Sequence, residues 1–375
     1  MTSTTSLTVV IPTYWGRPLP STFQPGDAIF DHPTPIDGTS TLPRLLESII
    51  EARRPRNMRV LVLVGVVHPS LGEAAEARVA HLISPFRVHL NIESVGPSRL
   101  SQWQHLAHHV GLPRETFTST TYPGIRNQQL LIPLLWGSDV IVALDDDEII
   151  RPDYFEVLFH TLETHPGWGF AGFYENPDGT VLLPEEPSRE NIFLDKARIM
   201  NMTLRRLLHH AGRWVPSPVA FGGNMVFRAS LARTVGFDPY ITRGEDIDYV
   251  LNAMISGHTI YVDKALRVVH MPPRSYEAPP YARLVEDVYR FFYDRAKMQK
   301  YGERISLNLH PYPGRFFQND LEEQALQALR SLATPQAVER WGSPEQVVAD
   351  AQKRAQERIK DFETFLRRWP YLFLK

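Results

Sequence analysis

Short apolar runs alternate with segments of helical periodicity between residues 7 and 164, and this alternation limits the fold more than any other feature. Residues 7–12, 58–67 and 139–144 are apolar almost throughout, which is typical of parallel strands covered on both faces, and we expect another strand at 86–92. Helical spacing predicts helices at residues 42–53, 70–83, 98–110, 125–136 and 152–164. The pattern predicts an α/β fold with an open, mostly parallel sheet between helices.

The rest of the chain mixes strands and helices and then becomes helical. We expect strands at residues 168–174, 224–227 and 266–269, and helices at 191–211 and 245–255. Long amphipathic helices follow at residues 281–301, 320–332 and 344–368. These last helices could pack on the α/β part, form a homodimer or serve as an interaction scaffold, and the sequence leaves these alternatives open.

Composition excludes several classes of function. Lys and Arg number 40 against 42 Asp and Glu, so the overall charge gives no sign of a nucleic-acid partner. The chain has no cysteine, which excludes disulfides, thiolate metal sites and a cysteine nucleophile. Any metal must therefore be held by oxygen or imidazole. The polar start and the strand-length apolar runs predict a cytoplasmic protein without a transmembrane segment.

Four adjacent acids, residues 145–148, directly follow an apolar strand. Ligands of open parallel sheets bind beyond the carboxyl ends of the strands. Carboxylate oxygens are the ligands that Mg²⁺ and Mn²⁺ prefer, and these ions often bridge to diphosphates. A solvated acidic loop, stabilised by the N-terminus of the helix after Pro152, is the alternative, and the run by itself leaves both open.

Residues 140–154 (VIVALDDDEIIRPDY) resemble the Asp-x-Asp segment of family 2 glycosyltransferases, in which a Pro-Asp helix start follows the acidic motif. The resemblance implies the GT-A fold of nucleotide-diphospho-sugar transferases. It implies that Asp147 ligates a metal and that Asp145 touches the donor's ribose or sugar or shares the metal. Asp146 would be the variable middle position.

Two segments earlier in the chain resemble the nucleotide-binding side of the same family. Residues 9–13 (VVIPT) are similar to the first strand, which implies that Pro12 and Thr13 contact the nucleotide. Residues 124–127 (GIRN) are similar to the family's Gly-x-x-x-Arg-Asn segment in shortened form, which implies that Arg126 and Asn127 lie near the nucleotide. Taken alone, Arg126 is more often a surface residue.

The acceptor side of the superfamily is matched by residues 221–228 (FGGNMVFR), 236–238 (GFD) and 243–248 (RGEDID). The resemblance implies that Gly222, Gly223 and Asn224 bind the donor sugar. In inverting members, Asp246 would deprotonate the acceptor hydroxyl, with Glu245 beside it. The alternative is that both acids only stabilise the N-terminus of a helix.

His270 ends a predicted strand, where GT-A enzymes often carry a third metal ligand, although a histidine at a strand end is usually structural. The resemblance thus implies Asp145, Asp147 and His270 around Mg²⁺ or Mn²⁺. It predicts a catalytic domain at residues 1–275, with a nucleotide-binding half at about 1–150 and an acceptor half at 151–275. Residues 276–375 would be a helical extension.

The activity implied by the resemblance is transfer of a sugar, most simply a hexose, from a nucleotide-diphosphate sugar to a hydroxyl acceptor, with inversion favoured over retention. The strand at 58–67 lacks the acidic pair with which the family reads the nucleotide base, which leaves the base open. Residues 15–41 form an unusual insertion, whose polar residues we interpret as ordinary loop groups: Asp27, Asp31, His32 and Asp37.

Two other functions share this kind of sheet. A sugar nucleotidyltransferase normally carries a Gly-rich basic loop with a lysine after the first strand, but no lysine precedes Lys196 here. A non-catalytic nucleotide-sugar-binding protein would have no need to retain Asp145, Asp147, Glu245 and Asp246 together. We therefore favour a glycosyltransferase.

Overall fold

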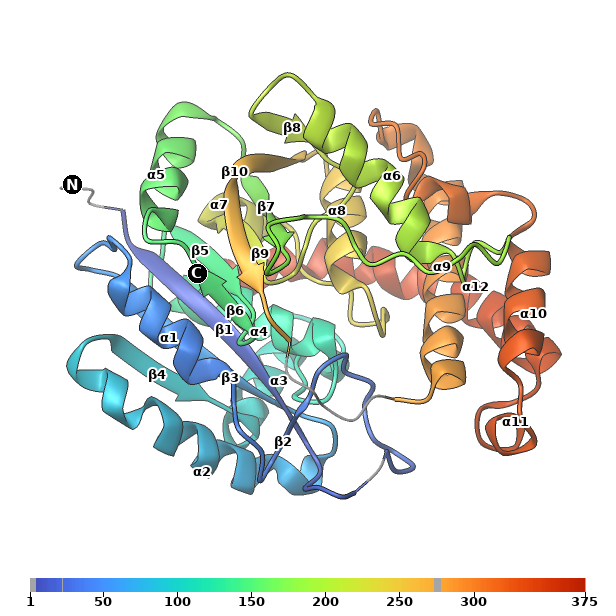
Figure 1. Cartoon of the computed structure of the whole chain (residues 1–375), viewed down its shortest axis with the longest axis horizontal. Helices are drawn as coiled ribbons and strands as arrows, with labels where there is room; N and C mark the ends of the chain where they lie inside the picture. Colours follow the sequence, from blue (N-terminus) through green and yellow to red (C-terminus); the bar gives the residue numbers. More distant parts are fainter. Residues whose placement is uncertain (1–4, 22, 273–277, 375) are drawn as a thin grey trace.

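The computed structural model describes residues 5–21, 23–272 and 278–374. Its centre is a sheet with the strand order β4-β3-β1-β5-β9-β7-β10-β6, and the short strands β2 and β8 pair with β1 and β10 (Figure 1). The strands are β1 (Leu7–Gly16), β2 (Thr34–Pro35), β3 (Arg59–Val66), β4 (Asn91–Val95), β5 (Val140–Leu144), β6 (Glu148–Ile150), β7 (Gly169–Glu175), β8 (Trp214–Pro216), β9 (Asn224–Arg228) and β10 (Ile260–His270). The predicted mostly parallel α/β sheet is confirmed, because β4, β3, β1 and β5 are parallel and β7 is parallel to β10.

Helices cover both faces of this sheet. The helices are α1 (Leu42–Glu51), α2 (Gly72–Ile83), α3 (Leu100–His109), α4 (Tyr122–Leu135), α5 (Tyr154–Thr164), α6 (Lys196–His209), α7 (Ala229–Thr234), α8 (Glu245–Ile255), α9 (Pro280–Tyr301), α10 (Leu321–Leu332), α11 (Pro335–Trp341) and α12 (Pro344–Arg368). Alternate residues of β1 serve two cores, because successive side chains of a strand point to opposite faces. Val9 and Ile11 pack with α1, α2 and α5, whereas Val10 belongs to the core that contains α4 and α8.

Most predicted elements are confirmed, but the strand predicted at residues 86–92 is wrong. Ser84–Val88 is a 3-10 helix, and Val88 is 81% exposed. The strand here is β4, which starts at Asn91 and pairs in parallel with β3. Its position is fixed by that pairing, which buries Ile92 and Val95. The apolar content of residues 86–92 gave no information about this register.

The carboxyl ends of β1, β5, β7 and β10 meet at one edge of the sheet. β9 runs in the opposite direction between β5 and β7, so its first residue, Asn224, lies at the same edge. Residues 145–148 follow β5, and His270 ends β10, where it is paired with Glu148 of β6. The topology therefore brings chain segments more than a hundred residues apart to one place.

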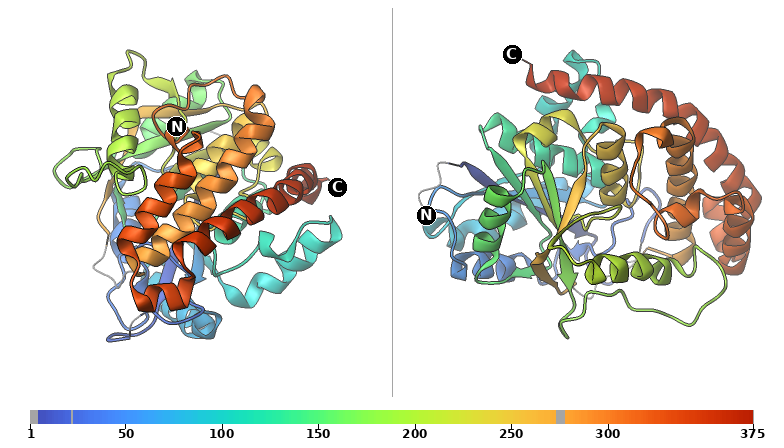
Figure 2. Two further views of the ribbon diagram at one scale, coloured as in Figure 1. Left: turned by 90° about the vertical axis from the view of Figure 1, so that its right-hand side faces the viewer. Right: turned by 90° about the horizontal axis from the view of Figure 1, so that it is seen from above.

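The C-terminal helices pack on the α/β part. Figure 2 shows α9, α10 and α12, coloured orange to red, grouped beside the sheet. Their side chains share one core with the strands, and the Trp369 indole donates to the Ala232 carbonyl of α7 at 2.9 Å. Packing is thus one confirmed alternative for these helices, and a homodimer stays a prediction. Among the described helices, none combines the length and the apolar character needed for crossing a membrane.

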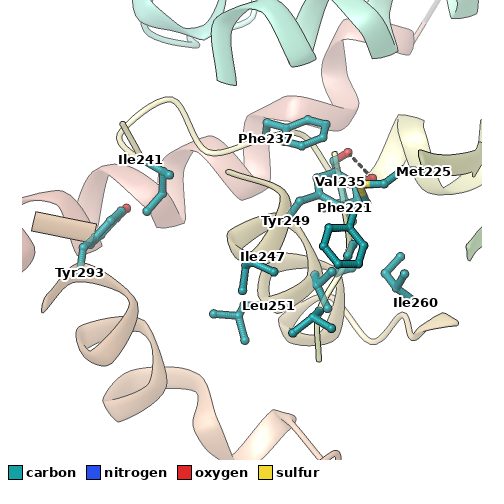
Figure 3. Packing of buried hydrophobic residues seen from close by; sticks show 14 of the residues in the cluster. Phe221, Met225, Val235, Phe237, Ile241, Ile247, Tyr249, Leu251, Ile260 and Tyr293 are labelled. Carbon is teal, nitrogen blue, oxygen red and sulfur yellow. Dashed lines mark hydrogen bonds between the residues drawn. The ribbon is translucent and has the colours of Figure 1, made fainter. Parts of the chain in front are cut away.

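Part of the shared core lies around the segment before α8. Figure 3 shows Phe237 near Tyr249, whose ring centroids are 4.4 Å apart, and a dashed line from the Tyr249 hydroxyl to the Val235 carbonyl, at 3.3 Å. Phe237 is also tied to α4, because its backbone N–H donates to the Asn127 side chain at 2.8 Å and its carbonyl accepts from the same amide. The core thus fixes α8 relative to α4.

A buried ionic group joins α9 to α8. The Lys297 ammonium is fully buried and pairs with Asp238, at 2.6 Å, and with Asp248, and it donates to Asn252 at 3.2 Å. The Tyr293 hydroxyl donates to Asp238 at 2.9 Å. Because two buried carboxylates depend on one ammonium, the start of α8 is anchored to the helical region.

We expect Lys297→Met to lower the free energy of unfolding by about 3–5 kcal/mol, because it leaves buried carboxylates without their counter-ion. Lys300→Met, on the same helix, is the control: its pair with Glu363 is exposed to solvent, so the loss should be much smaller. Urea denaturation followed by circular dichroism measures both. Equal losses in the two variants would contradict the assigned role of Lys297.

Candidate active site

A cleft of about 450 Å³ opens at the edge where the strand ends meet. Its lining comes from the end of β1, the insertion, α4, the acidic turn after β5, β7, α6, the start of α8, the end of β10 and α9. Several residues predicted from the sequence line it together: Arg126, Asp145, Asp147, Gly222, Glu245, Asp246 and His270. The two acidic segments, separated by about a hundred residues of chain, therefore face one space.

Arg126 joins these two acidic segments. Its guanidinium is buried and contacts Asp145 Oδ1 at 2.8 Å and Glu245 Oε1 at 3.2 Å, while Nη1 donates to Gln129 at 3.1 Å. Burial by itself would lower the pKa of Arg126, but the carboxylates outweigh burial and raise it well above its ordinary value. Arg126 is therefore a fixed positive charge between carboxylates, and not a surface residue.

Asp147 and His270 form the pair of side chains best placed to hold a cation. His270 Nε2 lies 3.3 Å from Asp147 Oδ2. Among the described residues, no group of three or more histidine, aspartate or glutamate side chains is arranged to hold a metal ion. Asp145 is engaged elsewhere, because Arg126 contacts one oxygen and the Tyr174 hydroxyl donates to the other at 3.1 Å. The donor set fits a divalent ion that takes its other ligands from substrate oxygens and water.

Tyr174, at the end of β7, organises this side of the cleft and was missed by sequence reasoning. Its hydroxyl donates to Asp145 and accepts from the Gly223 backbone N–H at 2.7 Å. Its ring stacks on His270, with centroids 4.9 Å apart, and on Phe221 at 4.6 Å. In the sequence, the signal that could have pointed to Tyr174 was its place at the end of a predicted strand. Tyr174 thus contacts one member of the candidate metal pair, His270, and also holds Asp145.

The two glycines before β9 are required by close packing. A Cβ at Gly222 would lie 2.6 Å from an Arg126 nitrogen, and one at Gly223 would lie 2.2 Å from Glu148 Oε1 and 2.6 Å from the Asp145 carboxyl carbon. A side chain would therefore push apart the Arg126 and Asp145 contact. In this structure the glycines allow the backbone to approach the acidic turn.

Glu245 and Asp246 open α8 at the cleft. The Asp246 carboxylate accepts from the Gly222 backbone N–H at 3.1 Å and from the Ile247 N–H at 2.8 Å. Burial, followed by repulsion from Asp246, raises the pKa of Glu245 to about 7, although Arg126 opposes the rise. Burial also raises the pKa of Asp246, although Arg290 opposes it. Because the two acids are adjacent, ionisation of one disfavours ionisation of the other.

Two acids that follow β5, Asp146 and Glu148, also have raised pKa values. Burial, with repulsion from Asp147, raises the pKa of Asp146 well above its ordinary value, although Thr13 donates to Asp146 at 2.5 Å. Burial, with repulsion from Asp145, raises the pKa of Glu148 in the same way. A divalent cation would relieve this repulsion, which is why such a turn suits one.

Some predicted site residues lie behind the cleft lining. Thr13 reaches the site only through its bond to Asp146. Asn127 is fully buried, and its side chain bonds the backbone of Thr116 and Phe237. Asn224 accepts from the Tyr154 hydroxyl at 3.0 Å and donates to backbone carbonyls, and Pro12 pairs within the sheet. These residues support the cleft from beneath.

The insertion contributes more to the cleft than the sequence indicated. Asp31 and His32 line it, and Asp31 pairs with Arg243 at 2.5 Å. Asp27 and Asp37 are loop-stabilising groups, as interpreted: Arg17 binds Asp27 at 2.7 Å, and Asp37 accepts from the Leu19 backbone at 3.1 Å.

Other cleft residues had no sequence signal. Tyr14 lines the cleft, and its hydroxyl has no hydrogen-bond partner among the described residues. The lining also includes the cations Lys196, Arg243 and Arg290. Lys196 and Arg243 are partly neutralised by Asp287 of α9, at 2.5 and 3.7 Å. They come from segments that pack together only in the tertiary structure.

Comparisons with known proteins found a matching family for part of the chain. Residues 140–321 match the family model described as Glycosyl transferase family group 2, and no curated protein matches the chain. The chain is similar to the mannosyltransferase PcManGT from Pyrobaculum calidifontis, in complex with GDP-Man and Mn²⁺, at 14% identity over 99% of this chain and 86% of that chain, with a TM-score of 0.46. It is similar to S. aureus TarS at 13% identity over 98% of this chain, with a TM-score of 0.43, and spans 54% of that chain.

These structural similarities have TM-scores below 0.5, so the assignment rests on the family match, the sequence motifs and the sheet topology. The matched region contains the acidic turn, the glycine pair, the start of α8 and His270, and it continues through α9. The predicted resemblance of the chain to family 2 glycosyltransferases of the GT-A fold is thereby confirmed.

Proposed function

We propose that the protein transfers a sugar from a nucleotide-diphosphate sugar to a hydroxyl acceptor, with the help of Mg²⁺ or Mn²⁺. The observation that carries the proposal is the convergence of two acidic segments on one cleft through Arg126. The family match supports a glycosyltransferase, and the pairing of Asp147 with His270 supports a metal. We place the catalytic domain at residues 1–275 and the helical extension at 276–375.

In the proposed reaction, the donor's diphosphate lies beside Asp147 and His270, which would hold the ion. A bound divalent ion supplies Lewis-acid stabilisation of the charge that develops on the leaving diphosphate. Asp145, held by Arg126 and Tyr174, faces the sugar or ribose of the donor. The Tyr14 hydroxyl, which has no hydrogen-bond partner in the described part of the chain, is a further hydrogen-bonding group for the nucleotide. Each of these groups is positioned before the substrate binds, so little reorganisation is needed.

Asp246 is the proposed general base. It stands at the N-terminus of α8, where two backbone N–H groups hold its carboxylate in a fixed orientation. Attack of the acceptor oxygen on the anomeric carbon breaks the bond to the diphosphate, and the acceptor proton passes to Asp246. This arrangement favours inversion. The raised pKa of Asp246 makes its carboxylate a better proton acceptor than an ordinary aspartate.

Asp147→Asn should abolish metal-dependent release of the nucleoside diphosphate, because a neutral amide is a poor ligand for a hard cation. We expect a loss of at least about a hundredfold. The measurement is a panel of UDP-, GDP- and ADP-sugars with Mg²⁺ or Mn²⁺, together with Mn²⁺ affinity by calorimetry. Asp153→Asn, an exposed residue at the start of α5, is the control. Unchanged release in the Asp147 variant would refute the metal assignment.

Asp246→Asn should lower turnover by about 10²–10⁴-fold, the usual contribution of a general base, while donor affinity stays near that of the native protein. Since water can replace the acceptor, proton NMR of donor hydrolysis reports the stereochemistry. Inversion predicts that the first free sugar has the anomeric configuration opposite to the donor's. Retention of configuration, or full turnover in the variant, would exclude Asp246 as the base.

The raised pKa of Glu245 predicts that the stability of the protein depends on pH. Its pKa is about 7 in the folded protein against 4.5 ordinarily, so its contribution to stability is full below pH 4.5 and is lost as pH rises to about 7. Glu245→Gln removes this titration, so the variant should gain up to about 3 kcal/mol relative to the native protein across that window. Denaturation at pH 4.5–8 measures it. Parallel pH profiles of the two proteins would contradict the raised pKa; exposed Glu339→Gln is the control.

A further inference from the structure

A second cavity of about 340 Å³ lies next to the cleft, between the insertion and the helices α9 and α11. Tyr122 lines both spaces, and Thr242 of the second cavity directly precedes Arg243 of the cleft. The wall between them is a packed aromatic group, in which Tyr122 and Phe30 have centroids 4.9 Å apart. The insertion and the C-terminal helices thus build this cavity. The proposed reaction leaves the role of these two parts of the chain unexplained.

Aromatic rings form one side of the second cavity. Phe23 of the insertion and Trp341 at the end of α11 are partly exposed and have centroids 6.5 Å apart. The Arg340 guanidinium lies over both, at 5.1 and 4.7 Å from the ring centroids. Partly exposed indole and phenyl faces are suited to the apolar C–H face of a sugar ring. An arginine over them holds the rings in place.

A carboxylate stands on α9 in the same lining. The Oε2 atom of Glu286 is buried and has no hydrogen-bond partner among the described residues. Such an atom in a native structure calls for an explanation, since an unmet buried acceptor costs about 1–3 kcal/mol. Asp27, the other acid of this lining, is neutralised by Arg17 in a two-pronged contact. Glu286 interacts with Thr242 and with the charges of Arg354 and Arg243, so its Oε2 atom is the specific acceptor that a ligand hydroxyl would satisfy.

We propose that the second cavity binds a neutral sugar ring of the acceptor, on the other side of Tyr122 from the hydroxyl that the cleft glycosylates. Hydroxyl groups would donate to Glu286 Oε2, and the ring would stack on Trp341 and Phe23. Because an arginine and a carboxylate, Arg340 and Glu286, both line the cavity, its lining favours neither a cation nor an anion, which fits an uncharged polyhydroxyl ligand. The volume is at the small end for ligand sites, which suits one or two sugar rings. The part about the acceptor rests on the proposed function.

The test is saturation-transfer NMR and calorimetry with methyl glycosides of glucose, galactose, mannose and N-acetylglucosamine and with their disaccharides. We expect at least one to bind, and Trp341→Ala and Glu286→Gln each to weaken binding about tenfold, through lost stacking and a lost hydrogen bond. Glu286→Gln keeps the test decisive if Trp341→Ala fails to fold. Glu339→Gln, on α11, and Tyr371→Ala, an exposed aromatic, are the matched controls.

Binding of none of these sugars, binding unchanged in both variants, or displacement of the bound sugar by uridine, guanosine or adenosine would each overturn the proposal. Nucleotide-sugar hydrolysis by the native protein is measured in parallel. If the native protein hydrolyses no nucleotide sugar but still binds a sugar, the proposed glycosyltransferase activity is wrong and the sugar-binding site stands. If the protein hydrolyses a nucleotide sugar but binds none of the test sugars, only the proposed sugar site in the second cavity is wrong.

Discussion

The site depends on one buried guanidinium held between two carboxylates. Asp145 follows β5 and Glu245 opens α8, and without a positive charge between them these segments would repel each other in a poorly hydrated space. Arg126 contacts both and comes from a third segment, α4. Because Gly222 leaves room for it, the guanidinium lies close to the backbone that precedes β9. The cleft can therefore be strongly acidic and still fold.

A second set of contacts fixes α8 from behind. Asn127, next to Arg126, bonds the backbone of Phe237, and the adjacent Asp238 pairs with Lys297 of α9. Asn127, the neighbour of Arg126, is thus linked through Phe237 and Asp238 to Lys297 of the helical region. The helical region consequently serves the site in two ways. It anchors the start of α8, and it supplies lining residues, from α9 to the cleft and from α9 and α11 to the second cavity.

Charge is distributed unevenly around the cleft, and this follows from its construction. Strand ends and the turn after β5 contribute acids, because that is the edge where the topology gathers them. The cations Lys196, Arg290 and Arg243 come from α6, from α9 and from the segment before α8. A nucleotide diphosphate needs a cation on the acidic side, whereas a neutral acceptor ring needs none. In the proposed reaction, the two cavities separate these requirements.

The sequence by itself determined the sheet, the order of its main elements and the positions of Asp145, Asp147, Asp246 and His270 at element ends, because periodicity and local motifs are properties of neighbouring residues. Only the tertiary structure decided the start of β4, which depends on pairing with β3, and the role of Tyr174, which depends on three segments meeting. It also decided that Arg126 is buried, since partners about twenty and a hundred and twenty residues away leave no local pattern.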